Sequence, residues 1–74
     1  MNLTITTPQG STSHSDVARF QFSSAAGLME FLPGHAPMIA ELRAGTMVIN
    51  HDDYTCGNGV VRIENDEITV VCEQ

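Results

Sequence analysis

Residues 27–37 of this chain read Gly27-Leu28-Met29-Glu30-Phe31-Leu32-Pro33-Gly34-His35-Ala36-Pro37. A short apolar strand is expected over 28–32, and a second strand is expected to begin at Met38. Pro33 and Pro37 exclude a helix between these strands, because proline lacks a backbone N–H and fixes its own φ. Pro33 followed by Gly34 is preferred in a tight turn whose third residue needs a positive φ. The segment therefore predicts two strands joined by a corner.

Alternating or β-branched runs predict further strands on both sides of this corner. They are the runs 3–7, 17–22, 38–42, 46–50, 54–56, 60–63 and 68–72. Residues 11–15 and 23–27 are expected to be loops, 51–53 a solvated turn, and 65–66 the centre of a hairpin. Within 17–22, the side chains of Ala18, Phe20 and Phe22 are expected on the buried face.

Turn signals recur at near-regular intervals, and no window shows a sustained helical period. This pattern predicts one all-β domain over residues 1–74, an antiparallel β-sandwich or flattened barrel of about eight to ten short strands. The turn residues on which this prediction rests are Pro33, Gly34, Pro37, Gly45, Gly57, Asn58 and Gly59. Gly57, Asn58 and Gly59 all tolerate a positive φ, which favours a turn or bulge there.

The charge of the chain excludes two classes of partner. The formal net charge is −6, with nine acidic residues against three arginines and no lysine. Such a surface is repelled by nucleic acid phosphates and by anionic lipid. No apolar run approaches the length of a membrane span. Cys56 and Cys72 are expected to be reduced and buried, and to act as small hydrophobic residues.

The corner and the end of the chain together resemble the epsilon subunit of F-type ATP synthases. The resemblance rests on 33–37, on the spacing from there to Gly45, and on an ending that reads Gly59-Val60-Val61-x-Ile63-x-x-x-x-Ile68-Thr69-Val70. It extends from Leu3 to Glu73, over the β-sandwich domain of that family. The family's helical hairpin beyond the sandwich, which restrains ATP hydrolysis, is expected to be absent. A truncated chain would look the same.

This resemblance implies a non-catalytic rotor subunit. It implies that the domain packs on the gamma subunit, rests on the c-ring and couples ion-driven rotation to ATP synthesis. The expected location is peripheral, on the cytoplasmic side of a bacterial inner membrane, and the isolated chain is expected to be monomeric. No cofactor and no ATP binding are expected. Proton and sodium coupling both stay open.

Two contact sites follow from the resemblance. The gamma-subunit contact is expected at His35, with Thr7, Ala36, Met38 and Ala40 on the same side. The alternative for His35 is that it caps its own turn and is simply exposed. The c-ring contact is expected at Ala26, Gly27, Leu28, Met29 and Glu30. The family often has a carboxylate where this chain has Leu28, so docking either uses the displaced charge of Glu30 or is apolar.

Other functions find less support in the sequence. The three histidines and two cysteines show no zinc-type spacing, so no metal site is predicted. A free-standing sandwich that binds a small ligand or a protein is the first alternative. A small enzyme is the second, and it would need a deep pocket that collects His35, Cys56 or the Asp52-Asp53 pair. No catalytic residue is predicted.

Overall fold

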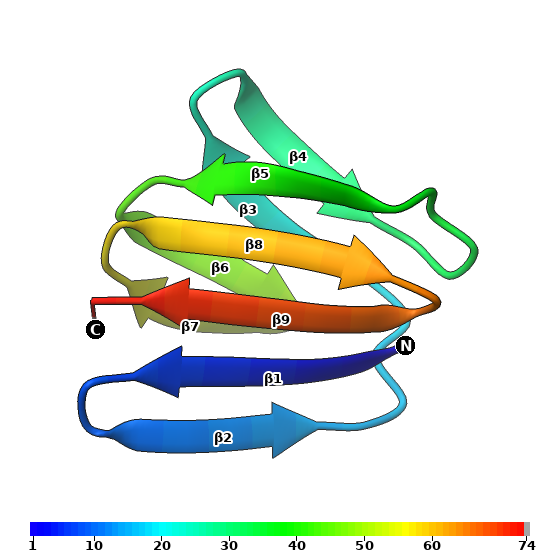
Figure 1. The fold of residues 1–74 in the computed structure, drawn as a ribbon, viewed down its shortest axis with the longest axis horizontal. Helices are drawn as coiled ribbons and strands as arrows, with labels where there is room; N and C mark the ends of the chain where they lie inside the picture. The colour runs from blue at the N-terminus through cyan, green and yellow to red at the C-terminus, as the bar shows by residue number, and fades with distance from the viewer. Residues whose placement is uncertain (74) are drawn as a thin grey trace.

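Strands form all the regular structure in the computed structural model, which describes residues 1–73 (Figure 1). No helix occurs among these residues. The nine strands of this part of the chain are β1 (Asn2–Thr7), β2 (Gly10–His14), β3 (Phe20–Ser24), β4 (Gly27–Phe31), β5 (Met38–Leu42), β6 (Gly45–Ile49), β7 (Asp52–Cys56), β8 (Gly59–Glu64) and β9 (Glu67–Cys72). The predicted all-β class and strand number are confirmed.

The strands form two sheets that face each other (Figure 1). The five-stranded sheet has the order β2-β1-β9-β8-β5, and the four-stranded sheet has the order β4-β3-β6-β7. Neighbouring described strands are antiparallel except β1 and β9, which run parallel with Leu3 beside Ile68. These two strands lie at opposite ends of the chain, so no tight hairpin forces them to be antiparallel. The antiparallel sandwich is confirmed with this one exception.

The two inner faces pack into a single apolar core. Along β9, Ile68, Val70 and Cys72 are buried while the residues between them are exposed, as the two-residue period of a strand requires. Phe20, Phe22 and Phe31 are fully buried, and the rings of Phe20 and Phe22 stack with centroids 5.2 Å apart. Burial of each ring contributes roughly 1.5–3 kcal/mol. This core fixes which face of each strand points outward.

The two cysteines lie in this core, which confirms their predicted burial. Cys56 and Cys72 are 4% and 5% exposed. Burial raises the pKa of the Cys56 thiol, and the nearby Cys72 adds to that rise. The Cys56 thiol therefore stays protonated near neutral pH and behaves as a small hydrophobe.

Two expected loops are partly strands. Residues 10–14 form β2 against β1, so the loop predicted over 11–15 is wrong; this edge strand is polar because both of its faces meet water. The loop predicted over 23–27 shrinks to Ala25 and Ala26. The Ser24 hydroxyl closes this turn, because it accepts from the Ala26 N–H at 3.1 Å and donates to the Gly27 carbonyl at 2.9 Å.

The start of β3 differs from the predicted strand over 17–22. Val17 is 1% exposed and Ala18 is exposed, the reverse of the predicted faces. Asp16 adopts a φ of 55°, which turns the chain before this segment. Val17 then exchanges two backbone hydrogen bonds of 2.9 Å with Met1 instead of joining β3. The strand starts only at Phe20.

The turn predicted over 51–53 is shifted towards the N-terminus. Asn50 and His51 make the turn, with Asn50 at a φ of 57°, and β7 begins at Asp52. Asp52 and Asp53 therefore pair with β6 rather than forming a solvated turn. The predicted hairpin at 65–66 is confirmed, with φ values of 51° and 60°.

The crossing from β7 to β8 needs glycine for a different reason from the predicted one. Gly57, Asn58 and Gly59 do not adopt positive φ. A Cβ at Gly59 would instead overlap the Val71 carbonyl oxygen and lie 2.7 Å from the Cys72 Cα. Asn58 holds the crossing by accepting from the Ala44 N–H at 2.8 Å. Close approach of β8 and β9 is thus the constraint at position 59.

We expect Gly59→Ala to lower the free energy of unfolding by about 1–3 kcal/mol, because the new methyl group must push β8 away from β9. Urea unfolding followed by circular dichroism measures the loss. Ser13→Ala on the exposed edge strand is the control and is expected to unfold at the wild-type midpoint. A Gly59→Ala midpoint equal to that of the wild type would contradict the steric explanation.

Candidate functional site

The corner joins the edge strand β4 of one sheet to the edge strand β5 of the other (Figure 1). The His35 N–H donates to the Leu32 carbonyl oxygen at 3.1 Å, and Gly34 has a φ of 86°. With Pro33 before Gly34, these features define a type II turn. The predicted corner and its need for glycine at position 34 are confirmed.

His35 is held by the corner that contains it. Its ring packs on Phe31 with centroids 4.7 Å apart, and its Nδ1 lies 2.7 Å from the Ala36 carbonyl oxygen. The side chain is half-buried. His35 therefore has local contacts within the corner and is not simply exposed. His35 is only half-buried and the neighbouring Ala36 is exposed, so a partner contact there stays a prediction.

The structure brings some of the expected gamma-contact residues together and separates others. His35, Ala36 and Met38 lie within four consecutive residues at the corner. Met38 and Ala40 pack against the core. Thr7 ends β1 at the opposite end of the sandwich from the corner (Figure 1). Thr7 and His35 therefore do not form one compact site.

The outer face of the five-stranded sheet carries exposed aliphatic side chains that the sequence analysis did not single out. Ile39 is 69% exposed, Val60 48% and Val71 53%, and Val60 and Val71 are paired across β8 and β9. The sequence feature that could have predicted them is the pair of doublets Val60-Val61 and Val70-Val71. A β-branched pair on a strand places one side chain inside and one outside.

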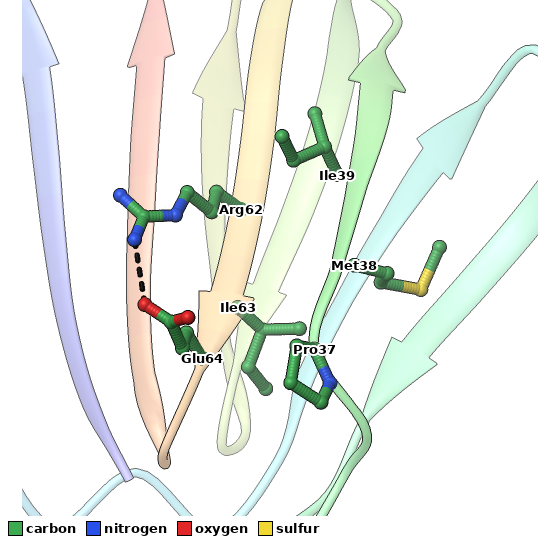
Figure 2. A pocket seen from close by; sticks show the side chains of 6 residues that line it. All are labelled: Pro37, Met38, Ile39, Arg62, Ile63 and Glu64. Atoms are coloured by element: carbon green, nitrogen blue, oxygen red, sulfur yellow. Dashed lines mark hydrogen bonds and ion pairs between the residues drawn. The ribbon is translucent and has the colours of Figure 1, made fainter.

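A shallow hollow lies between β5 and β8, next to the corner. It measures about 370 Å³ and is lined by Pro37, Met38, Ile39, Arg62, Ile63 and Glu64. Figure 2 shows the ion pair at its rim, in which Arg62 Nη2 lies 2.7 Å from Glu64 Oε1. His35, Cys56 and the Asp52-Asp53 pair do not line it. The hollow thus lacks the side chains that the enzyme alternative requires.

The expected c-ring segment forms the β3–β4 hairpin, with Ala26 at its tip. Leu28 is 70% exposed on the outer face of β4, while Met29 is half-buried and packs against the core. Pairing with β3 explains the difference, because Met29 lies opposite the buried Phe22 and Leu28 lies opposite Ser23. Of the two residues considered for an apolar contact, Leu28 is the one that the fold presents.

Glu30 uses its charge within the domain. Its Oε2 lies 2.7 Å from Arg19 Nε, and Arg19 also donates to the Gln21 side chain at 3.3 Å. Both side chains of the ion pair are 37% exposed, so the pair is partly screened by solvent. A partner would have to compete with Arg19 for this carboxylate.

Metal sites and membrane-spanning helices are the next features to consider in the described residues. Residues 1–73 contain no group of three or more His, Cys, Asp or Glu side chains that could hold a metal ion. In the same part of the chain, no helix has the length and apolarity to cross a membrane. The features that remain are the corner, the hairpin tip and the exposed aliphatic outer face of the five-stranded sheet.

Known ATP synthase epsilon chains are similar to this sequence. The chain is 32% identical over 78 residues to that of Staphylococcus haemolyticus, covering 99% of this chain and 59% of the relative. It is 30% identical to that of Campylobacter curvus, covering 99% and 60% respectively. The chain thus spans about three-fifths of the length of these relatives.

Solved structures share the fold. The central stalk and c-ring structure of the Tetrahymena thermophila mitochondrial ATP synthase matches with a TM-score of 0.83 and 12% identity, over 100% of this chain and 63% of the matched chain. A Euglena gracilis mitochondrial ATP synthase structure matches with a TM-score of 0.87 and 19% identity, over 97% and 49%. At the level of sequence, residues 1–74 match the family described as ATP synthase, Delta/Epsilon chain, beta-sandwich domain. The chain belongs to this family.

Proposed function

We propose that the domain is a non-catalytic part of the rotor of an F-type ATP synthase. It joins the gamma subunit of the central stalk to the membrane c-ring and couples ion-driven rotation to ATP synthesis. The family match over the whole chain carries this proposal. The domain would lie on the cytoplasmic side of a bacterial inner membrane, without inserting into it.

The gamma subunit is proposed to bind at the corner and along the adjoining part of β5. His35 and Ala36 offer a rigid surface there, and the half-buried Met38 and Ala40 are reached from the open edge of the sheet. Ile39 joins this surface from the outer face. Exposed aliphatic groups beside a turn of fixed shape suit a protein partner, because little conformational freedom is lost on binding.

The c-ring is proposed to meet the β3–β4 hairpin through an apolar contact. Leu28 is the most exposed large hydrophobic side chain of the described residues, and Ala25 and Ala26 beside it are small and exposed. Glu30 contributes less, because Arg19 already pairs with it. The proposed docking is therefore apolar at a position where the family often supplies a carboxylate.

Strand β4 connects the two proposed contacts. It begins at the hairpin tip and ends at Phe31, one residue before the corner turn. Five residues of strand span about 17 Å. Phe31 is fully buried, so a force applied at the tip reaches the corner through a strand fixed in the core. This is how a small sandwich can pass torque without a moving part.

We expect the 74-residue chain to co-elute with the gamma subunit from the same source at one-to-one stoichiometry in size-exclusion chromatography. The apolar surface at the corner would be covered by gamma, which holds the two chains together at micromolar concentration. Separate elution of two folded proteins would contradict the stalk role. It would favour a free-standing binding module instead.

Gly34→Val is expected to weaken gamma binding by roughly tenfold, because a β-branched residue is strained at the φ of Gly34 and the corner must change shape. Pro33→Ala removes only the fixed φ of proline and is expected to lower the affinity for gamma about two- to fivefold. Isothermal titration calorimetry against gamma measures both, with Ser13→Ala as the unchanged control. Equal affinities for all three variants would place gamma elsewhere on the domain.

Leu28→Asp is expected to weaken binding of the gamma–epsilon complex to detergent-solubilised c-ring by about tenfold or more, because it removes an exposed apolar anchor. Glu30→Gln keeps the size of its side chain and is expected to change binding less than threefold, since its charge is paired with Arg19. Co-sedimentation measures both. The reverse order of effects would support charge-mediated docking through Glu30.

A further inference from the structure

The turn between β8 and β9 has aspartate at a position where glycine is the preferred residue. Asn65 and Asp66 have φ values of 51° and 60°, so both lie in the left-handed region. Asn-Gly is preferred in such a two-residue hairpin, because glycine adopts a positive φ without steric cost. Aspartate at the second position loses part of that advantage. Local departures of this kind are expected where a side chain has another task.

The side chain of Asp66 reaches the corner. Its Oδ1 accepts a hydrogen bond of 2.8 Å from the Gly34 N–H, although the two residues are 32 positions apart in sequence. In a type II turn the N–H of the third residue is not used by the turn's own hydrogen bond. A carboxylate is a strong acceptor for it. Figure 1 shows the corner and the β8–β9 turn at the same end of the sandwich.

This bond adds a side-chain link between the first half of the corner and the β8–β9 hairpin, which β5 otherwise meets only after the corner, where Met38 pairs with Ile63. The turn hydrogen bond to Leu32 and the ring contact of His35 with Phe31 both connect the corner to the end of β4. Asp66 connects it to the β8–β9 hairpin of the five-stranded sheet. The hairpin is itself fixed, because the Asp66 carbonyl oxygen accepts from the Asn2 N–H at 2.9 Å.

We propose that Asp66 is a positioning residue, which holds the 33–37 corner in the shape that the gamma subunit binds. The inference rests on the proposed function of the corner. A loop that is already ordered loses less conformational entropy when a partner covers it, so the clip from Asp66 to Gly34 raises the affinity of the corner without itself being buried by gamma. Asp66 thereby links the C-terminal hairpin to a surface formed more than 30 residues earlier.

Asp66→Gly separates this role from a role in the hairpin turn. Glycine favours the turn at least as much as aspartate does, so the variant is expected to fold and to keep the β8–β9 pairing. It removes only the acceptor for the Gly34 N–H. Asp66→Asn is the matched control, because asparagine tolerates a positive φ and retains an Oδ1 acceptor.

Two measurements on the full chain test the proposal. Amide hydrogen exchange by NMR is expected to show the Gly34 N–H exchanging about three- to tenfold faster in Asp66→Gly than in the wild type. Calorimetry is expected to show about three- to tenfold weaker binding to gamma, with Asp66→Asn closer to the wild type in both measurements. Urea unfolding of each variant confirms that the hairpin and core are retained.

The outcomes distinguish this proposal from the function on which it rests. Wild-type affinity of Asp66→Gly for gamma would overturn the positioning role alone, whether or not the exchange at Gly34 rises. Unchanged exchange at Gly34 would overturn the clip. Failure of the wild-type chain itself to bind gamma would overturn the proposed function, and the positioning role with it.

Discussion

The packing of Phe20, Phe22 and Phe31 between the sheets is the interaction on which the other features depend. All three rings are fully buried, with neighbouring centroids 5.2 to 6.3 Å apart. A domain of this size buries only about 60% of its unfolded surface. The three rings are the largest fully buried side chains of residues 1–73. They fix β3 to β4, and they place the end of β4 where the chain must cross between sheets. The corner is the consequence of that placement.

The same cluster makes the surface rigid. His35 packs on the outer side of the cluster through Phe31, and Asp66 holds the other side of the corner through Gly34. The corner is therefore fixed from both sheets at once, although it has no regular structure of its own. The proposed rotor role would need such stiffness, because a loop that yielded under load would not transmit rotation to a partner. Rigidity here comes from a few contacts rather than from size.

The sequence predicts the features that depend on local backbone chemistry. Proline next to Gly34 predicts the corner, and Asn65 with Asp66 predicts the last hairpin. The sequence does not predict features that depend on contact with a strand far away along the chain. The polar residues 10–14 are a strand only because β1 supplies backbone hydrogen bonds, and Gly59 is needed only because β9 passes close to it. At the site, the exposure of Leu28 rather than Met29 follows from the register with β3, which a sequence alone leaves open.

Electrostatics narrow the kind of surface that can bind this domain. Each of the three arginines lies within 4 Å of a glutamate, in the pairs Arg19–Glu30, Arg43–Glu41 and Arg62–Glu64. The other six of the nine acidic side chains take no part in these ion pairs within residues 1–73, so the surface has an excess of negative charge. Two such surfaces repel each other, which opposes self-association of the chain. The corner and the hairpin tip present aliphatic groups within this acidic surround, so a complementary partner needs an apolar patch rimmed by basic or amide groups.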